Sequence, residues 1–149
     1  MEINTPVSRI LNVKGSTVHS ISPEATVSEA VKTMNEKKIG SLLVVHMGKP
    51  VGMFTERDVL TRVVDTCADP KSTKVRDVMT SQLVAIRPSL SIEDTMRIIT
   101  QKRCRHLPVV EDGVLLGMIS IGDVMRWFVR EHEMYIENLL DYINGAYPG

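Results

Sequence analysis

Apolar residues gather in two kinds of stretch that alternate along the first half of the chain. Residues 41–45 form a near-continuous apolar run, which is typical of a buried strand. Residues 51–54 form a second run after a Gly-containing turn. Apolar residues at helical spacing mark residues 26–34 and 56–65 as helices. A looser alternation over residues 13–21 predicts a short first strand. The expected order is therefore strand, helix, two antiparallel strands and helix.

The same order returns in the second half of the chain at a fixed distance. Residues 52–59 read GMFTERDV and residues 117–124 read GMISIGDV, so 117 − 52 gives an offset of 65. Pro88 is equivalent to Pro23 at the same offset. An unbroken register of this length is typical of a tandem duplication, here of one β-α-β-β-α unit. Because each unit alone would leave a sheet face uncovered, we expect the two to pack sheet to sheet in a mixed α/β (α+β) fold.

A further helix is expected at each end of the duplicated unit. Apolar residues at helical spacing after Pro6 predict a short N-terminal helix. The last helix continues past the repeat to Gly145, a residue type that commonly ends helices. Its apolar stripe comprises Trp127, Phe128, Tyr135, Leu139 and Tyr142. The expected boundaries are residues 8–66 for repeat one, 67–74 for a linker, 75–132 for repeat two and 133–149 for the C-terminal helical extension and tail.

Composition narrows the possible partners. The 149 residues include 18 Lys and Arg and 18 Asp and Glu, so the formal net charge is zero. The chain therefore has no excess positive charge that would favour binding to nucleic acid or to a membrane surface. Aromatic residues make up 4%, which leaves little for stacking on bases. No apolar run approaches the ~18–20 residues of a membrane span, and no secretory signal is recognisable. Cys67 and Cys104 lack a CxxC spacing and the histidines lack metal-ligand spacing, so we expect reduced thiols, a cytoplasmic location and no metal.

The strongest chemical signal is a hydroxyl residue three positions before an aspartate, present once in each repeat. Thr55 precedes Asp58, and Ser120 precedes Asp123, each pair at the start of a predicted helix. One interpretation is a capping box, in which side chains and backbone groups of the first turn bond reciprocally. The other is a binding site, because the N-terminus of a helix attracts anions and polar hydroxyls. A single copy favours the capping interpretation, whereas two copies in register within one module favour a ligand.

These motifs, the strand over residues 105–110 (RHLPVV) and the duplication together resemble a cystathionine-β-synthase (CBS) domain pair, also called a Bateman module, over residues 8–132. The resemblance implies a regulatory module that binds an adenosine compound in two clefts between the repeats. The implied ligands are AMP, ADP, ATP, NAD(H) and S-adenosylmethionine. Dimers of modules, and an effector protein on another chain that responds to energy or redox state, are implied as well.

The resemblance also assigns residues to the two clefts. Asp58 and Asp123 would accept from the ribose hydroxyls in charge-assisted contacts, and Thr55 and Ser120 would hold phosphate oxygen. Matching positions for the adenine slot in repeat one are Lys14, Gly15, His19, Ile39, Gly40 and Ser41. Those in repeat two are Met79, Thr80, Val84, Cys104, Arg105 and His106. Arg57 and Gly122 directly precede the two aspartates and are assigned to the clefts with them. Met53, Met118 and Cys104 are expected mainly to pack in the core, and only secondarily to line a cleft.

Clefts in this family are crossed, so that the Asp of one repeat faces the adenine slot of the other. The implied pairs are Asp58 with Val84, Arg105 and His106, and Asp123 with His19, Gly40 and Ser41. The first pairing is basic, with Arg57 beside Asp58, whereas the second is largely neutral. The Asp58 cleft should therefore be the better site for a polyphosphate or a pyrophosphate.

Three classes of function remain open. A regulatory ligand-binding module leads. An enzyme is disfavoured, because the sequence holds no nucleophile–base constellation, no P-loop and no GxGxxG. The alternative to the regulatory module is a ligand-independent scaffold that dimerises and binds partners.

A two-fold homodimer is expected in either case. The helices over residues 56–65 and 121–144 carry more apolar residues than one small module can cover. These residues are Val59, Val63, Val124, Trp127 and Phe128, and the extension over residues 135–142 is expected to add contact.

Overall fold

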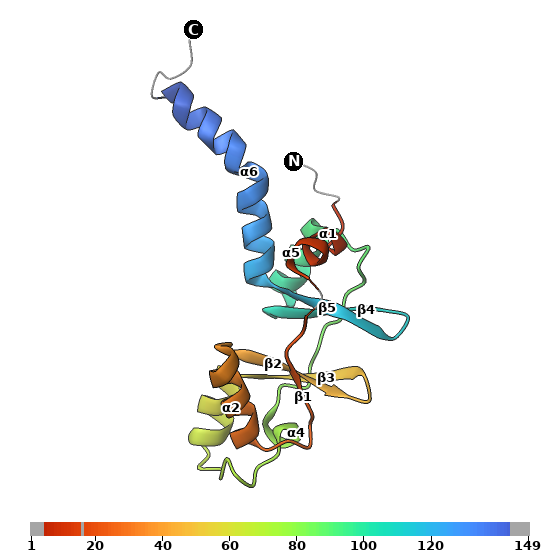
Figure 1. The fold of residues 1–149 in the computed structure, drawn as a ribbon, viewed down its shortest axis with the longest axis vertical. Coiled ribbons are helices and arrows are strands. Elements are labelled where there is room, and N and C mark those ends of the chain that lie inside the picture. Colours follow the sequence, from red (N-terminus) through yellow and green to blue (C-terminus); the bar gives the residue numbers. More distant parts are fainter. Residues whose placement is uncertain (1–4, 16, 144–149) are drawn as a thin grey trace.

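Two small sheets lie one above the other in the computed structural model, with helices on their outer faces (Figure 1). The structure describes residues 5–15 and 17–143, and for residues 134–136, 138, 139 and 142 it describes the backbone alone. The elements of the first repeat follow the predicted order. They are β1 (Ser20–Ile21), α2 (Val27–Lys37), β2 (Ser41–His46), β3 (Lys49–Thr55), α3 (Glu56–Asp58) and the π-helix η1 (Val59–Val64).

Local sequence signals explain these elements. Thr26 caps α2 through a complete capping box with Glu29, and the buried face of α2 carries Val27, Ala30 and Met34, as predicted. The β2 strand pairs antiparallel with β3 and parallel with β1, which gives a three-stranded sheet. The prediction for the first repeat is confirmed except in its last helix.

The second repeat differs from the predicted unit in its first strand. Its elements are α4 (Val75–Val78), α5 (Ile92–Lys102), β4 (His106–Glu111), β5 (Val114–Ser120) and α6 (Ile121–Ile143). The β4 and β5 strands form an antiparallel pair, and only an isolated parallel bridge between Ile86 and Val109 stands where β1 stands in the first repeat. Even the irregularity in strand register recurs, between Val44 and Val45 and again between Val109 and Val110. The mixed α+β fold and the duplication are therefore confirmed.

The helix predicted over residues 56–65 is only partly an α-helix. After one turn of α3, the η1 segment adopts π geometry, as the bond from the Asp65 N–H to the Leu60 carbonyl over 3.0 Å shows. In this arrangement Val63 is 3% exposed and lies in the core, whereas Leu60 and Val64 face outward. Simple 3.6-residue periodicity could not place these three side chains, because the π turn shifts the faces.

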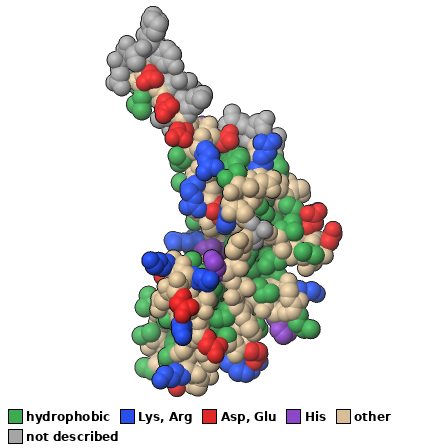
Figure 2. All heavy atoms as spheres, viewed as in Figure 1, with side chains coloured by type: hydrophobic (Ala, Val, Ile, Leu, Met, Phe, Trp, Pro, Cys, Tyr) green, Lys and Arg blue, Asp and Glu red, His purple; other side chains and the backbone are tan. Residues whose placement is uncertain are grey.

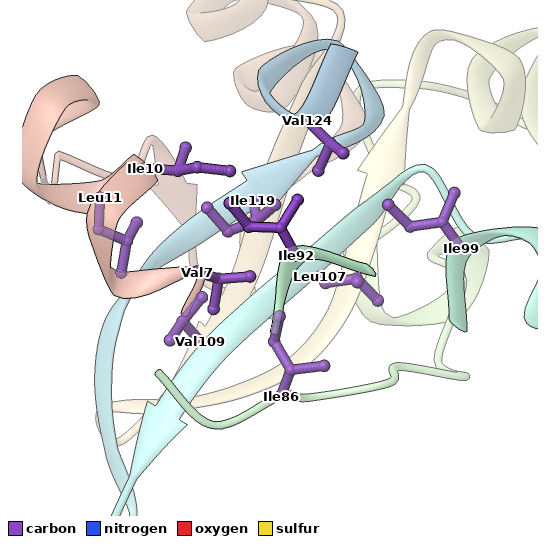
Figure 3. Close-up of a cluster of buried hydrophobic side chains, with 10 residues drawn as sticks. All are labelled: Val7, Ile10, Leu11, Ile86, Ile92, Ile99, Leu107, Val109, Ile119 and Val124. Carbon is purple, nitrogen blue, oxygen red and sulfur yellow. The ribbon is translucent and has the colours of Figure 1, made fainter. Parts of the chain in front are cut away.

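The short helix that precedes each repeat packs in the core of the other repeat. Val7, Ile10 and Leu11, from α1 (Ser8–Lys14) and the residue before it, lie in a cluster with Ile119 of β5 (Figure 3). At the position equivalent to Ile10, Val75 of α4 lies in the core of the first repeat. The repeats therefore exchange their leading helices, and neither core is built from one repeat alone.

The two sheets meet through a small apolar cluster. Leu43 of β2, Met53 of β3 and Met118 of β5 are buried together between the sheets. Met53 and Met118 are equivalent positions, since 118 − 53 is 65. The predicted sheet-to-sheet packing is confirmed, and it places the starts of α3 and α6 on the two sides of the interface between the repeats.

The expected dimer face needs a correction. Val63 and Val124 are 3% and 1% exposed, so they belong to the core of the single chain and cannot cover a partner. Trp127 and Phe128 are half-buried against the second core. The side chains of Tyr135, Leu139 and Tyr142, and residues Asn144 and Gly145, lie outside the part that the structure describes. The apolar residues exposed on these helices are Leu60, Val64, Ile121, Met125, Val129, Leu140 and Ile143.

One pair of equivalent glycines offers a matched test of the packing between the repeats. A Cβ on Gly52 would lie 2.8 Å from the carbonyl oxygen of Thr80. That oxygen accepts from the Met53 N–H, and the Thr80 N–H donates to the Met53 carbonyl, so the Thr80 backbone is held in place. A Cβ on Gly117 would instead meet the Leu11 side chain, which can rotate away. We expect Gly52→Ala to lower the free energy of unfolding by about 1–3 kcal/mol.

Gly117→Ala should have a clearly smaller effect on the same quantity. Urea unfolding of both variants measures the difference, and melting temperatures should follow at roughly 2–4 °C per kcal/mol for a chain of this size. Equal destabilisation by the two substitutions would contradict the tight approach of Thr80 to β3.

Candidate functional site

A large hollow lies between the two repeats. This hollow, cleft 1, has a volume of about 620 Å³. The first repeat contributes Gly40, Ser41, Met53, Thr55, Glu56 and Arg57. The second contributes Thr80, Gln82, Leu83, Lys102, Arg103, Cys104, Arg105 and His106. Residues of the Asp58 motif thus face the slot of the other repeat, which is the crossed arrangement that the sequence resemblance implies.

Cleft 1 is strongly basic. Arg57, Lys102, Arg103 and Arg105 line it, opposed by the single carboxylate of Glu56. Figure 2 shows blue basic side chains gathered beside a histidine halfway along the molecule. Cations on the wall of a hollow raise the local concentration of anions. The sequence predicts the arginines at 57 and 105 as cleft residues but not the two cations at the end of α5.

Asp58 lies behind the wall of cleft 1. Its side chain is 6% exposed, and one carboxylate oxygen accepts from the backbone N–H and the hydroxyl of Thr55 over 2.9 and 3.1 Å. The other oxygen accepts from the Thr80 hydroxyl over 3.1 Å, and the Arg62 guanidinium lies 3.7 Å away. The capping box is therefore complete in the protein itself. Asp58 thereby orients Thr55 and Thr80, which do line the cleft.

A second hollow lies on the other side of the repeat interface. This hollow, cleft 2, has a volume of about 340 Å³. It combines the Asp123 motif with apolar and polar residues of the first repeat. Its lining is Lys14, Thr17, Val18, His19, Ile39, Ser41, Leu43, Met53, His106, Met118, Ser120, Asp123 and Arg126.

Asp123 is held by two cations and a cap. Its carboxylate accepts from Lys14 over 2.6 Å, from Arg126 over 2.7 Å and from the Ser120 backbone N–H over 2.8 Å. Burial acts to raise the pKa of the Asp123 carboxyl, but the bonds from Lys14 and Ser120 outweigh it, so the pKa is held below its ordinary value. Arg126 was missed by the sequence reasoning, although its spacing of three residues from Asp123 on a helix could have revealed the pair.

The two clefts share a wall. Ser41, Met53 and His106 line both. The Ser41 hydroxyl lies 3.3 Å from Nε2 of His106, and these residues are equivalent, because 106 − 41 is 65. Burial lowers the pKa of His106, and the nearby positive charges of Lys14 and Arg105 lower it further against the opposing effect of Asp123. A neutral imidazole therefore stands between the clefts at pH 7.

This burial predicts a pH effect on stability. Because the pKa of His106 in the folded chain lies below its ordinary value of 6.5, the unfolded chain takes up a proton first as the pH falls. The contribution to stability is present above pH 6.5 and is lost below it. We expect His106→Gln to reduce the loss in free energy of unfolding between about pH 7.5 and about pH 5.5.

Urea unfolding at the two pH values measures this difference. His46→Gln, in the exposed end of β2, is the matched control and should leave the pH dependence unchanged. An identical pH dependence in the parent protein and in His106→Gln would contradict the argument.

Some residues expected at the clefts lie elsewhere. Gly40 lines cleft 1, although it was paired with Asp123, and Val84, which was paired with Asp58, packs against the core of the second repeat. Met79 packs in the first core beside Gly52. Gly15 ends α1 with a φ of 94°, and Gly122 lies beside Ser120 and Arg126. Lys14, His19, Ile39, Ser41, Met53, Thr55, Arg57, Thr80, Arg105, His106, Met118, Ser120 and Asp123 do line a cleft.

The two repeats match the family model of the CBS domain over residues 7–65 and 75–130. The chain belongs to the CBS domain family. It is 36% identical over 153 aligned positions to the CBS domain-containing protein CBSX3, mitochondrial, of Arabidopsis thaliana, with 97% of this chain and 74% of the relative covered.

Solved structures agree with this assignment. The crystal structure of the CBS domain NE2398 has a TM-score of 0.79 and 38% identity, and the match covers 84% of this CBS domain protein and 98% of that chain. A hexameric CBS-CP12 protein from bloom-forming cyanobacteria has a TM-score of 0.71 and 34% identity, with 84% and 72% covered. Within the described residues, no helix combines the length and the apolarity that crossing a membrane needs.

Proposed function

We propose that this CBS domain protein is a regulatory module that binds adenosine nucleotides in clefts 1 and 2 and passes the ligand state to a partner protein. The observation that carries the proposal is that each cleft joins residues from the start of a helix in one repeat to basic or apolar residues of the other. In cleft 2, Asp123 offers a buried acceptor for ribose hydroxyls, and Val18, Ile39 and Met118 offer an apolar slot for adenine.

The two clefts differ in the ligand that they favour. Cleft 1 carries four Lys and Arg residues against one carboxylate and is the larger hollow, so it favours a nucleotide with two or three phosphates. Cleft 2 carries Lys14 and Arg126 against Asp123 and has less net charge. ATP or ADP is therefore the ligand that we propose for cleft 1.

Binding in either cleft would affect the arrangement of both repeats. Both clefts bridge the two repeats, and Ser41, Met53 and His106 belong to both. A ligand that draws the repeats together stabilises one relative arrangement of the helices on the outer faces. A partner protein that binds this arrangement better would respond to the ligand.

A regulatory role is supported over a catalytic one. Cys104 lines cleft 1, but burial raises the pKa of its thiol, and a protonated thiol is a poor nucleophile. Asp58 behind cleft 1 and Asp123 in cleft 2 already hold hydroxyl groups and helix starts in place. These roles fit binding rather than proton transfer. The free thiols of Cys67 and Cys104 fit a reducing compartment, for which we propose the cytoplasm.

A thermal-shift panel tests the function. AMP, ADP, ATP, NAD, NADH and S-adenosylmethionine are each added at a large excess to the purified full chain. A ligand at a hundredfold excess over its Kd should stabilise the folded state by about 2.7 kcal/mol. A melting temperature that no member of the panel raises would overturn the proposal.

A ligand-independent scaffold is the second candidate, and one observation favours it. Asp58 and Asp123 both have complete sets of protein partners, which a ribose would have to replace. Failure of the whole panel, together with an intact oligomer, is the result that this candidate predicts.

We also propose a homodimer, on a face revised from the one expected. Leu60 and Met125 are equivalent exposed positions, because 125 − 60 is 65, and Val64 and Val129 are equivalent in the same way. Two matching apolar rows at corresponding sites of the two repeats suit a self-complementary contact between two copies. The hexameric CBS-CP12 relative shows that chains of this family assemble with one another.

A further inference from the structure

A third hollow lies beyond Asp123, between α1 and α6. This hollow, the α1–α6 groove, has a volume of about 360 Å³. Ile10, Val13 and Trp127 are its apolar lining residues, and Lys14, Arg126 and Arg130 are its basic ones. The groove shares Lys14, Asp123 and Arg126 with cleft 2, so the two hollows meet at this ionic group.

The groove carries an excess of positive charge. Asp123 is the one carboxylate in its lining, and it already holds both Lys14 and Arg126, at 2.6 and 2.7 Å. Arg130 is exposed, and no carboxylate of the described residues forms an ion pair with it. An anion entering from cleft 2 would therefore meet three cations that one carboxylate only partly neutralises.

The apolar side of the groove suits a planar ring. Val13 is 62% exposed, and Trp127 lines the groove while it is half-buried against the second core. An indole beside aliphatic side chains offers a stacking surface for an aromatic or heteroaromatic ring. The groove therefore pairs a phosphate-binding side with a ring-binding side.

We propose that the α1–α6 groove is the second half of an extended site for an adenine dinucleotide whose adenosine lies in cleft 2. Lys14, Arg126 and Arg130 would hold the two linking phosphates, and Trp127 would stack on the second base. The proposal rests on nucleotide binding in cleft 2. The groove has about the volume of cleft 2, so the joint hollow gives a second nucleoside its own space.

The duplication shows that this extension is specific to cleft 2. At the offset of 65, the equivalents of Arg126, Trp127 and Arg130 are Thr61, Arg62 and Asp65. The equivalent of Lys14 is Met79. The equivalent region beside Asp58 thus has neither the indole nor the three cations. Cleft 1 should accept ATP and an adenine dinucleotide through its own basic wall, without a preference for the second nucleoside.

Trp127 makes the test direct, because it is the only tryptophan in the chain. Titration of the full-length protein with NAD should change the tryptophan fluorescence, whereas ADP, which lacks the second nucleoside, should not. Arg130→Gln should weaken NAD binding, followed by this signal, by about tenfold. The binding of ADP in cleft 1, which Arg130 does not line, should be unchanged by calorimetry. Arg9→Gln, an equal loss of charge on the exposed side of α1, is the matched control and should leave both unchanged.

The outcomes separate this inference from the proposed function. If NAD binds by calorimetry but leaves Trp127 fluorescence unchanged, and Arg130→Gln binds it as the parent protein does, the inference is overturned and nucleotide binding stands. If ADP and NAD give the same fluorescence change, the groove does not bind the second nucleoside, and the inference again fails. Absence of any calorimetric binding would overturn the proposed function and the inference together.

Discussion

Asp58→Ala is expected to weaken the tighter of two ATP-binding events by about tenfold to a hundredfold, and Asp123→Ala is expected to spare it. Loss of Asp58 removes the acceptor that orients Thr55 and Thr80 on the wall of cleft 1. Removing hydrogen bonds to a charged group costs on the order of 1.5–3 kcal/mol in binding, or about a tenfold to a hundredfold loss of affinity. Cleft 1 carries most of the basic side chains, so the tighter ATP event belongs there.

Both variants should still fold. The Thr55 and Ser120 hydroxyls accept from the backbone N–H groups of residues 58 and 123, and these cap bonds do not need the carboxylates. The lost interaction with the helix dipole costs about 1 kcal/mol or less. Calorimetry with ATP on the two variants, and on the exposed control Asp65→Ala, measures the effect. Equal loss from Asp58→Ala and Asp123→Ala would contradict the charge difference between the clefts, and unfolding of either would assign the carboxylate a purely structural role.

Val129→Glu is expected to convert the homodimer into a monomer. Val129 is 62% exposed in the single chain, and a two-fold contact would bury it in both copies. A carboxylate placed there would lose its hydration without a partner, twice per dimer, which costs several kcal/mol. Light scattering at micromolar concentration should give the mass of a dimer for the parent protein and that of a monomer for the variant.

A matched control lies on the hairpin of the second repeat. Val114 is 59% exposed at the start of β5, so Val114→Glu makes the same chemical change away from the proposed face. This variant should remain dimeric. A monomeric parent protein, or a dimer that survives Val129→Glu, would refute the proposed face.

The parts of the fold that depend on local signals were predictable from the sequence. Apolar runs, caps and a register of 65 residues identified the strands, both helix starts and the duplication, because each depends on neighbours in the chain. The crossed clefts came from resemblance to a family rather than from periodicity. Their geometry follows from the exchange of α1 and α4, which places Lys14 on Asp123 and Thr80 on Asp58.

Features that depend on long-range packing were missed. The spacing of Val7, Ile10 and Leu11 shows that α1 has an apolar face, but spacing cannot say which of two similar cores receives it. For the same reason Val63 and Val124 were assigned to a dimer contact although the single chain buries them. Lys102 and Arg103 escaped notice because only the folded chain shows that the end of α5 borders cleft 1.

The exchange of leading helices has a consequence for how the chain is made. When synthesis has passed only the first repeat, α1 has no core to enter, because its partners such as Ile92 and Ile119 come later in the chain. The first repeat is also incomplete at that moment, since it lacks Val75 and Val78. Neither half can therefore finish folding on the ribosome before the other exists. The duplicated halves should fold after release as one cooperative unit, although each resembles an independent domain in sequence.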